Sequence, residues 1–62
     1  MATLAERLKR IREQNDWTQE VLASRLDVSR RTLESWEQNR RTPSGFTLAA
    51  LMKWLDEQER PT

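Results

Sequence analysis

Apolar residues recur at helical intervals along a chain that contains only one glycine and two prolines. Leucine, glutamate, arginine and alanine are frequent, and these residues lose little side-chain freedom in a helix. No stretch alternates apolar and polar residues over the length of a strand. The sequence therefore predicts an all-α fold.

A chain of 62 residues suffices for one domain, so residues 1–62 are predicted to form a single unit with a small core. Disorder needs low hydrophobicity together with high net charge. Here 11 basic and 10 acidic residues leave a net charge of +1. We therefore expect a folded domain, and total charge alone does not point to nucleic acid.

The chain has no cysteine and no histidine, which excludes disulfides, Cys/His zinc sites and Cys or His catalysis. No set of nucleophile, base and metal ligands is present, so we expect no enzyme, no metal and no cofactor. The longest apolar stretch, Leu48 to Met52, is far shorter than the roughly 20 residues that cross a bilayer. Without a signal-peptide pattern, we expect a soluble cytoplasmic protein.

The first helix is predicted to begin with a capping box between Thr3 and Glu6. Leu4, Leu8 and Ile11 then follow at i, i+4 and i+7 and form one apolar stripe. Its other positions are charged: Arg7, Lys9, Arg10 and Glu13. A turn is expected at residues 14–16.

The second helix is predicted to start after Thr18 as N-cap, with a hydrophobic staple between Trp17 and Leu22. It should end at Arg25 or Leu26. Its expected buried face is Val21, Leu22, Ala23 and Leu26. Residues 27–29 form a tight connection.

Ser29 should cap a third helix over Arg30 to Gln38, with Leu33 and Trp36 pointing inward. A fourth helix is expected from about Ser44 to Gln58, with either Thr42 or Ser44 as its cap. Pro43 suits a first helical position because its φ is fixed. The core stripe of the fourth helix is predicted to be Leu48, Leu51, Met52 and Leu55, beside a second row of Phe46, Ala50 and Trp54.

These apolar positions cover more than half of the fourth helix, which is wide for one small core. Phe46 and Trp54 are therefore predicted to contribute to a homodimer interface. Tryptophan can also stack on unpaired bases. Helical spacing beside leucine favours a core position for Trp17 and Trp36 instead.

Two short helices joined by a three- or four-residue turn make a helix-turn-helix, here about residues 18–38. The stretch from Gln19 to Gln38 resembles, residue by residue, the Cro/repressor-type (XRE, lambda-repressor-like) family of DNA-binding domains. Ala23 stands where two helices cross closely, and Val28, Leu33 and Trp36 fill the core positions. The resemblance covers about residues 4–55 and implies a four-helix domain, with at most a short fifth turn where relatives have a fifth helix.

The family commonly has glycine where this chain has Asp27 and Asn39. Both positions are expected to be left-handed, a conformation that Asp and Asn tolerate best among non-glycine residues. Arg12 and Glu37 match a pair that joins the first helix to the end of the third in relatives. The acidic residues Asp56, Glu57 and Glu59 are expected to form a solvated tail.

The resemblance implies that the third helix enters the major groove of DNA and that its first residues meet base edges. The matching positions are Ser29, Arg30, Arg31, Glu34 and Ser35. Arginine can bind guanine through two hydrogen bonds. Because neighbouring residues lie roughly 100° apart around a helix, one arginine is expected to read a base and the other to bind phosphate. Glu34 either accepts from cytosine or orients Arg30 or Arg31, and the ion pair is favoured.

Phosphate contacts are predicted at Thr18, Gln19, Gln38, Asn39, Arg40 and Arg41. Gln19 either offers its side chain and neighbouring amides to a phosphate or is merely solvated. The implied function is a repressor that binds a palindromic double-stranded DNA operator as a dimer, in the nucleoid of a bacterial or phage-infected cell. An antitoxin with a toxin partner is an alternative, because residues 29–55 also resemble antitoxins of this fold. A helical protein-interaction module without DNA binding is another.

Overall fold

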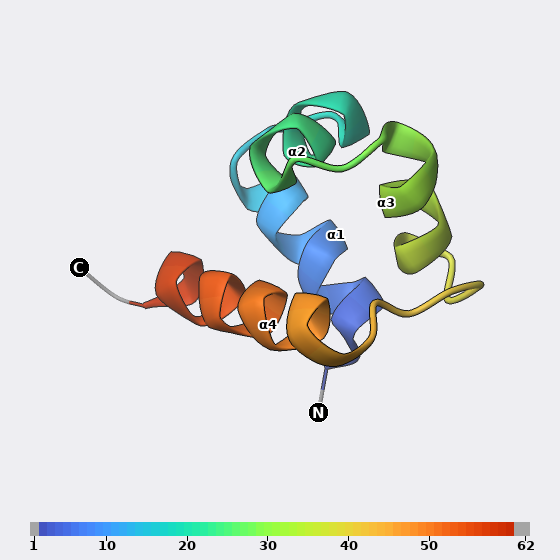
Figure 1. The fold of residues 1–62 in the computed structure, drawn as a ribbon. Helices are drawn as coiled ribbons and strands as arrows, with labels where there is room; N and C mark the ends of the chain where they lie inside the picture. Colours follow the sequence, from blue (N-terminus) through green and yellow to red (C-terminus); the bar gives the residue numbers. More distant parts are fainter. Residues whose placement is uncertain (1, 61–62) are drawn as a thin grey trace.

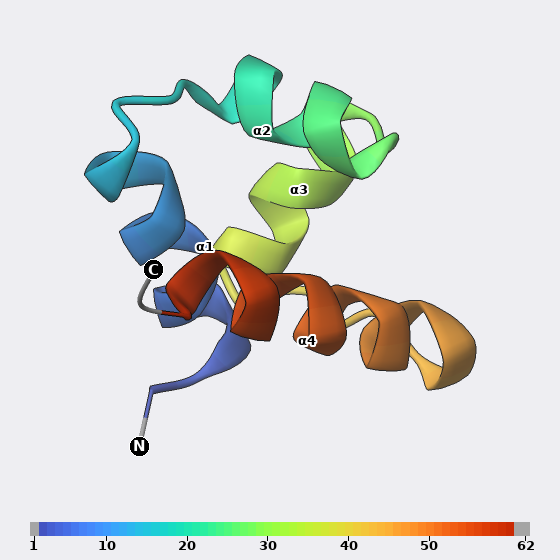
Figure 2. The same cartoon turned by 90° about the vertical axis from the view of Figure 1, so that its left-hand side faces the viewer.

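The computed structural model describes residues 2–60. They form four helices in the order α1 (Leu4–Gln14), α2 (Gln19–Leu26), α3 (Arg30–Glu37) and α4 (Gly45–Glu59). Figures 1 and 2 show α2 and α4 at opposite ends of the molecule, with α1 and α3 between them. No strand occurs in this part of the chain, so the all-α, lambda-repressor-like prediction is confirmed. Within the same residues no fifth turn follows α4, and no helix is both long and apolar enough to cross a bilayer.

The first three helices begin directly after the N-cap residues that the sequence predicted, Thr3, Thr18 and Ser29. Thr3 Oγ1 accepts from the Glu6 amide at 3.2 Å, and Glu6 Oε1 accepts from the Thr3 amide at 3.2 Å, which completes the capping box. The Thr3 hydroxyl also hydrogen-bonds to Glu6 Oε1 at 3.0 Å, and the bonds that this carboxylate accepts from the Thr3 amide and hydroxyl hold the pKa of Glu6 below its usual value. Thr18 and Ser29 cap α2 and α3 without a capping box, through hydroxyls that accept from the amides of Val21 and Thr32.

The start of α4 differs from the prediction. Pro43 is buried but lies before the N-cap residue Ser44, so it does not occupy the first helical position. Ser44 forms no side-chain cap bond. The chain instead turns into the helix at Gly45, whose φ of +52° is a conformation that only glycine adopts without strain.

The core takes one fully buried leucine from each helix: Leu8, Leu22, Leu33 and Leu55. Ile11, Ala23, Trp36 and Leu51 complete the buried cluster, and Leu4, Trp17, Leu26, Val28 and Trp54 pack around it half-buried. This arrangement confirms most of the predicted stripes.

Two residues predicted to be buried lie at the surface, Val21 at 40% exposure and Met52 at 36%. A helix of two turns can direct only a narrow stripe at its neighbours, and in α2 Leu22 and Ala23 fill it. In α4 the buried stripe narrows to Leu51 and Leu55. Periodicity alone therefore overestimated both buried faces.

Arg7, one of the charged residues outside the apolar stripe of α1, is largely withdrawn from solvent. Its guanidinium donates to Asp56 Oδ1 at 2.8 Å and to Glu59 Oε2 at 3.1 Å, and only 13% of its side chain is exposed. The bonds to Glu59 and then Asp56 raise the pKa of Arg7. The last turns of α4 are thus held against α1, and Asp56 and Glu59 do not form a purely solvated tail.

Three turns depend on left-handed residues. Asp27 (φ 59°) and Asn39 (φ 61°) adopt the predicted conformation, and Asp16 (φ 58°) does so as well. After Asp27, the amide of Val28 donates to the carbonyl of Ala23 at 3.0 Å and closes the turn of the helix-turn-helix. The direction in which α3 leaves α2 is set at this residue.

Asp27→Gly should be more stable than Asp27→Ala by about 1 kcal/mol, because alanine is strained at positive φ and glycine is not. Urea unfolding followed by tryptophan fluorescence measures the difference. Ser24 is a solvent-exposed residue in the middle of α2. There the order should reverse, and Ser24→Ala should be more stable than Ser24→Gly by about 1 kcal/mol. The same order at both positions would contradict the role given to the left-handed turn.

Candidate nucleic-acid interface

Helix α3 is fixed by its inner face. Leu33, Trp36 and Glu37 are buried, whereas Arg30 and Arg31 are exposed in its first turn. Glu34 and Ser35 are half-buried on the outer side. Since three of its eight residues are anchored in the interior, α3 presents its leading end and outer face to solvent in a fixed orientation.

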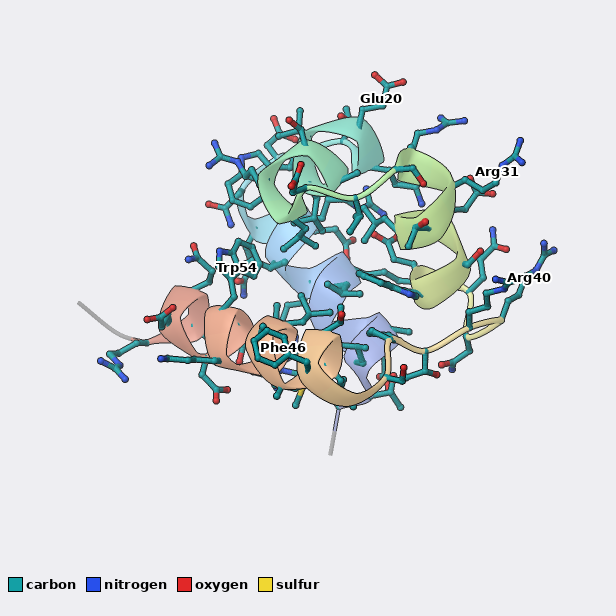
Figure 3. All side chains as sticks on the ribbon, viewed as in Figure 1. Glu20, Arg31, Arg40, Phe46 and Trp54 are labelled. Atoms are coloured by element: carbon teal, nitrogen blue, oxygen red, sulfur yellow. The ribbon has the colours of Figure 1, made fainter. Side chains whose placement is uncertain are left out.

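A groove of about 860 Å³ follows this outer face. It is lined by Arg30, Arg31, Thr32, Glu34, Ser35, Trp36, Gln38, Arg40 and Arg41. Figure 3 shows Arg31 and Arg40 projecting from the same side of the molecule. Four arginines therefore share one surface although the whole chain carries a net charge of only +1.

The loop after α3 is folded back onto the helix. The amides of Arg40 and Arg41 donate to the carbonyl of Ser35 at 3.0 and 3.4 Å, and the left-handed Asn39 makes this reversal possible. Arg40 and Arg41 are thereby held beside α3. The predicted phosphate contacts Gln38, Arg40 and Arg41 thus lie on the same groove as four of the five predicted base contacts, all except Ser29.

A second, smaller hollow of about 560 Å³ lies at the start of α2 and is lined by Arg12, Thr18, Gln19, Glu20 and Arg30. Arg30 lines both hollows, so it stands between the first turn of α2 and the outer face of α3. Arg30 thus reaches both hollows, whereas Arg31 lines the groove along α3. Ser29 is exposed, and its hydroxyl both caps α3 and hydrogen-bonds to the Thr32 hydroxyl at 2.9 Å.

An ion pair with a buried carboxylate lies beside the smaller hollow, which Arg12 lines. Arg12 Nε donates to Glu37 Oε2 and Arg12 Nη2 to Glu37 Oε1, both at 3.0 Å, and the Glu37 side chain is only 2% exposed. This is the pair that the family resemblance implied. Two parallel charge-assisted hydrogen bonds offset part of the cost of removing the carboxylate from water.

Gln19 joins the same pair. Its Nε2 donates to Glu37 Oε1 at 3.3 Å, so the side chain is neither merely solvated nor wholly free for a ligand. The network links α1, α2 and α3 through Arg12, Gln19 and Glu37. It also holds Gln19 at the edge of the smaller hollow, beside the first-turn amides of α2.

Glu34 does not pair with Arg30 or Arg31 among residues 2–60, contrary to the favoured prediction. Its Oε1 instead accepts from Gln38 Nε2 at 3.4 Å, one turn further along the helix. Arg31 points away from the molecule in Figure 3. Neither Arg30 nor Arg31 forms an ion pair within residues 2–60.

Sequence reasoning missed Glu20, whose carboxylate projects from the start of α2 (Figure 3) and which lines the smaller hollow with Arg30. A single acidic residue in the first turn of a helix is ordinary and stabilises that end. No local pattern therefore marked Glu20 as part of the surface around α3.

Comparison with known proteins decides the family, because the helix-turn-helix family model HTH_3 matches residues 8–58. The chain belongs to the XRE-type helix-turn-helix family. It is an all-α DNA-binding protein of that type. A comparison with solved structures gave no significant match.

Two curated relatives are antitoxins. The chain is 36% identical over 56 residues to antitoxin HipB of Escherichia coli strain K12, which covers 90% of this chain and 60% of that protein. It is 34% identical over 56 residues to antitoxin HipB of Escherichia coli O6:H1 (strain CFT073), covering 90% of this chain and 56% of that protein. The chain thus spans less than two thirds of the length of these relatives.

Arg12→Ala should destabilise the protein by about 3 kcal/mol, because it leaves the buried Glu37 carboxylate without its counter-charge. Arg10→Ala, an exposed position on the same helix, should change stability by less than about 0.5 kcal/mol. Urea unfolding measures both. In Arg12→Ala/Glu37→Ala the loss should be smaller than the sum of the two single losses; a strictly additive result would show that the pair is not coupled.

Proposed function

We propose that this chain is a sequence-specific double-stranded DNA-binding repressor that inserts the leading end of α3 into the major groove. The observation that supports it best is the groove on which Arg30, Arg31, Arg40 and Arg41 gather. B-DNA presents phosphates on both sides of a major groove that admits one helix. An arginine-lined helix with further arginines held beside it has the charge and shape for that surface.

Within this proposal the outer face of α3 reads bases. Arg31 binds guanine O6 and N7 through its two-pronged guanidinium, and Ser35 lies one turn further along the same face. Glu34, which has no arginine partner among residues 2–60, accepts from a cytosine amino group. Ser29 contacts the base at the start of the helix.

The surroundings of α3 bind the DNA backbone. Arg30 reaches a phosphate at the start of α2 together with Thr18, Gln19 and the first-turn amides, where the helix dipole favours an anion. Gln38, Asn39, Arg40 and Arg41 bind phosphates on the other side of α3. Such contacts fix position and orientation without reading sequence.

A dimer on a palindromic operator completes the proposal. Two recognition helices about 34 Å apart, one turn of B-DNA, would each read one half-site. Selection of bound duplexes from a random pool tests the whole assignment and gives the operator. Repeated failure to enrich any duplex would reject DNA recognition and favour the protein-interaction alternative.

Arg31→Ala should lose discrimination at one base pair in each half-site, worth about 1–3 kcal/mol. Arg40→Ala should weaken binding to all duplexes by a similar factor and leave base preferences unchanged. Fluorescence anisotropy with the selected duplex and its single-base variants separates the two effects. Lys9→Ala, exposed on α1, is the control; equal losses in all three variants would contradict the proposed assignment.

Affinity should fall steeply with salt, because each neutralised phosphate releases condensed counterions. Removing one phosphate contact, as in Arg41→Ala, should reduce the slope of log K against log salt by about 1. Titrations between low and physiological salt measure this slope. An unchanged slope in both Arg40→Ala and Arg41→Ala would remove these residues from the phosphate contacts.

An antitoxin role is the second candidate, and the similarity to antitoxin HipB favours it. In that case the chain would bind DNA as well as a toxin protein. Co-expression with the product of a neighbouring gene, followed by purification through a tag on this chain, tests it. A stoichiometric complex that still binds the selected duplex would support the antitoxin role over a repressor without a protein partner.

A further inference from the structure

The two hollows beside α3 differ in charge. Four arginines line the groove along α3, with Glu34 as its one acidic residue. The smaller hollow at the start of α2 has Arg12, Arg30 and Glu20 as its charged lining residues. Because Arg12 is paired with Glu37, the charges of Arg30 and Glu20 remain and cancel each other. The smaller hollow is therefore close to neutral, although it shares Arg30 with a strongly basic groove.

The carboxylate of Glu20 is free to act on a ligand. The residue is exposed, and it takes part in no ion pair within residues 2–60. Figure 3 shows its side chain projecting from the start of α2, at the end of the molecule where α3 begins. A negative charge at this place meets any polyanion that lies against the first turns of α2 and α3.

A phosphate that enters the smaller hollow is subject to opposing forces. Arg30 and the first-turn amides of α2 attract an anion, whereas the Glu20 carboxylate repels it. Both side chains line the same hollow, and charges closer than about 8 Å are only partly screened at physiological salt. The balance therefore depends on position: a phosphate beside Arg30 is attracted, and one displaced toward Glu20 is repelled.

This dependence on position distinguishes an operator from random DNA. Non-specific binding comes from phosphate contacts alone, and the protein slides and hops along the duplex, so phosphates take many positions in the hollow. On an operator the base contacts of α3 hold the duplex in one register. A like charge that opposes the wrong arrangements raises specificity without adding a contact to the right one.

We propose that Glu20 is a specificity-determining residue, which raises the ratio of operator binding to random-DNA binding by repelling phosphates that enter the smaller hollow out of register. In the operator complex Arg30 stands between Glu20 and the bound phosphate and offsets the repulsion. The carboxylate thus costs little affinity where α3 is seated in its register and more where it is not. The inference deepens the proposed function and rests on it, since it needs a sequence that α3 reads.

Glu20→Gln keeps the shape of the side chain and removes its charge. It should tighten binding to a random duplex about tenfold, and binding to the selected duplex by no more than about twofold. On the random duplex the slope of log K against log salt should steepen by about 1, because one more phosphate is held. Fluorescence anisotropy measures both affinities, and Glu20→Asp, which keeps the charge, should bind as the unchanged chain does.

Glu57→Gln is the matched control. Glu57 is an exposed residue of α4, which lies at the opposite end of the molecule from α2 (Figure 1). The substitution makes the same change in net charge, but far from the two hollows. It should therefore alter the affinities for the selected and the random duplex by one common factor, smaller than about twofold.

A double substitution tests the part given to Arg30. In an Arg30→Gln background, adding Glu20→Gln should tighten binding to the selected and the random duplex by the same factor. The reason is that the cation that offsets the repulsion on the operator is then missing. A gain that is still confined to the random duplex would show that Arg30 does not offset the charge of Glu20.

A purely structural role of Glu20 predicts a change of opposite sign. A carboxylate in the first turn of α2 stabilises that end of the helix. On that account alone, Glu20→Gln should lower the unfolding midpoint slightly and weaken binding to every duplex. The proposal expects tighter binding to random DNA in spite of this loss.

Equal tightening of the selected and the random duplex by Glu20→Gln, or weaker binding to both, would overturn the inference while leaving the proposed function intact. Failure of the proposed function looks different. In that case no duplex is enriched from the random pool, and the unchanged chain itself binds all duplexes alike.

Discussion

The orientation of α3 depends on one buried carboxylate. Glu37 accepts from Arg12 on α1 and from Gln19 on α2, so one side chain near the end of α3 ties three helices together. A carboxylate that is 2% exposed is costly unless it is paired and fully hydrogen-bonded. The same bonds that satisfy it fix the angle between α3 and the first turn of α2. Neither helix could provide that rigidity alone, because each has only eight residues.

With α3 fixed in this way, the placement of charge matters more than its total. Arg7 pairs with Asp56 and Glu59 in the last turns of α4. Arg12 pairs with the buried Glu37. Arg30, Arg31, Arg40 and Arg41 are left together on one groove. A chain with a net charge of +1 therefore presents a strongly basic surface, which overall composition could not reveal.

The features predicted from sequence are those that depend on neighbouring residues. Thr3, Thr18 and Ser29 cap amides three residues away, and Asp27 and Asn39 take left-handed turns through their own side-chain chemistry. The pairing of Arg7 with Glu59, 52 positions away, follows from where α4 crosses α1. The bond from Gln19 to Glu37 likewise needs the packed helices. Only the resemblance to a family, not local pattern, pointed to the long-range pair of Arg12 and Glu37.

Helix α4 shows that a small core can leave some apolar residues of a helix exposed to solvent. Of its apolar residues, only Leu51 and Leu55 are buried, and Phe46 adds nothing to the packing of the isolated chain. Removing Phe46 should therefore have little effect on folding. The stripe of α4 that points inward contributes to the stability of the domain, whereas exposed apolar residues such as Phe46 contribute little to it. Hydrophobic periodicity detects both and cannot tell them apart, which is why Met52 was assigned to the core.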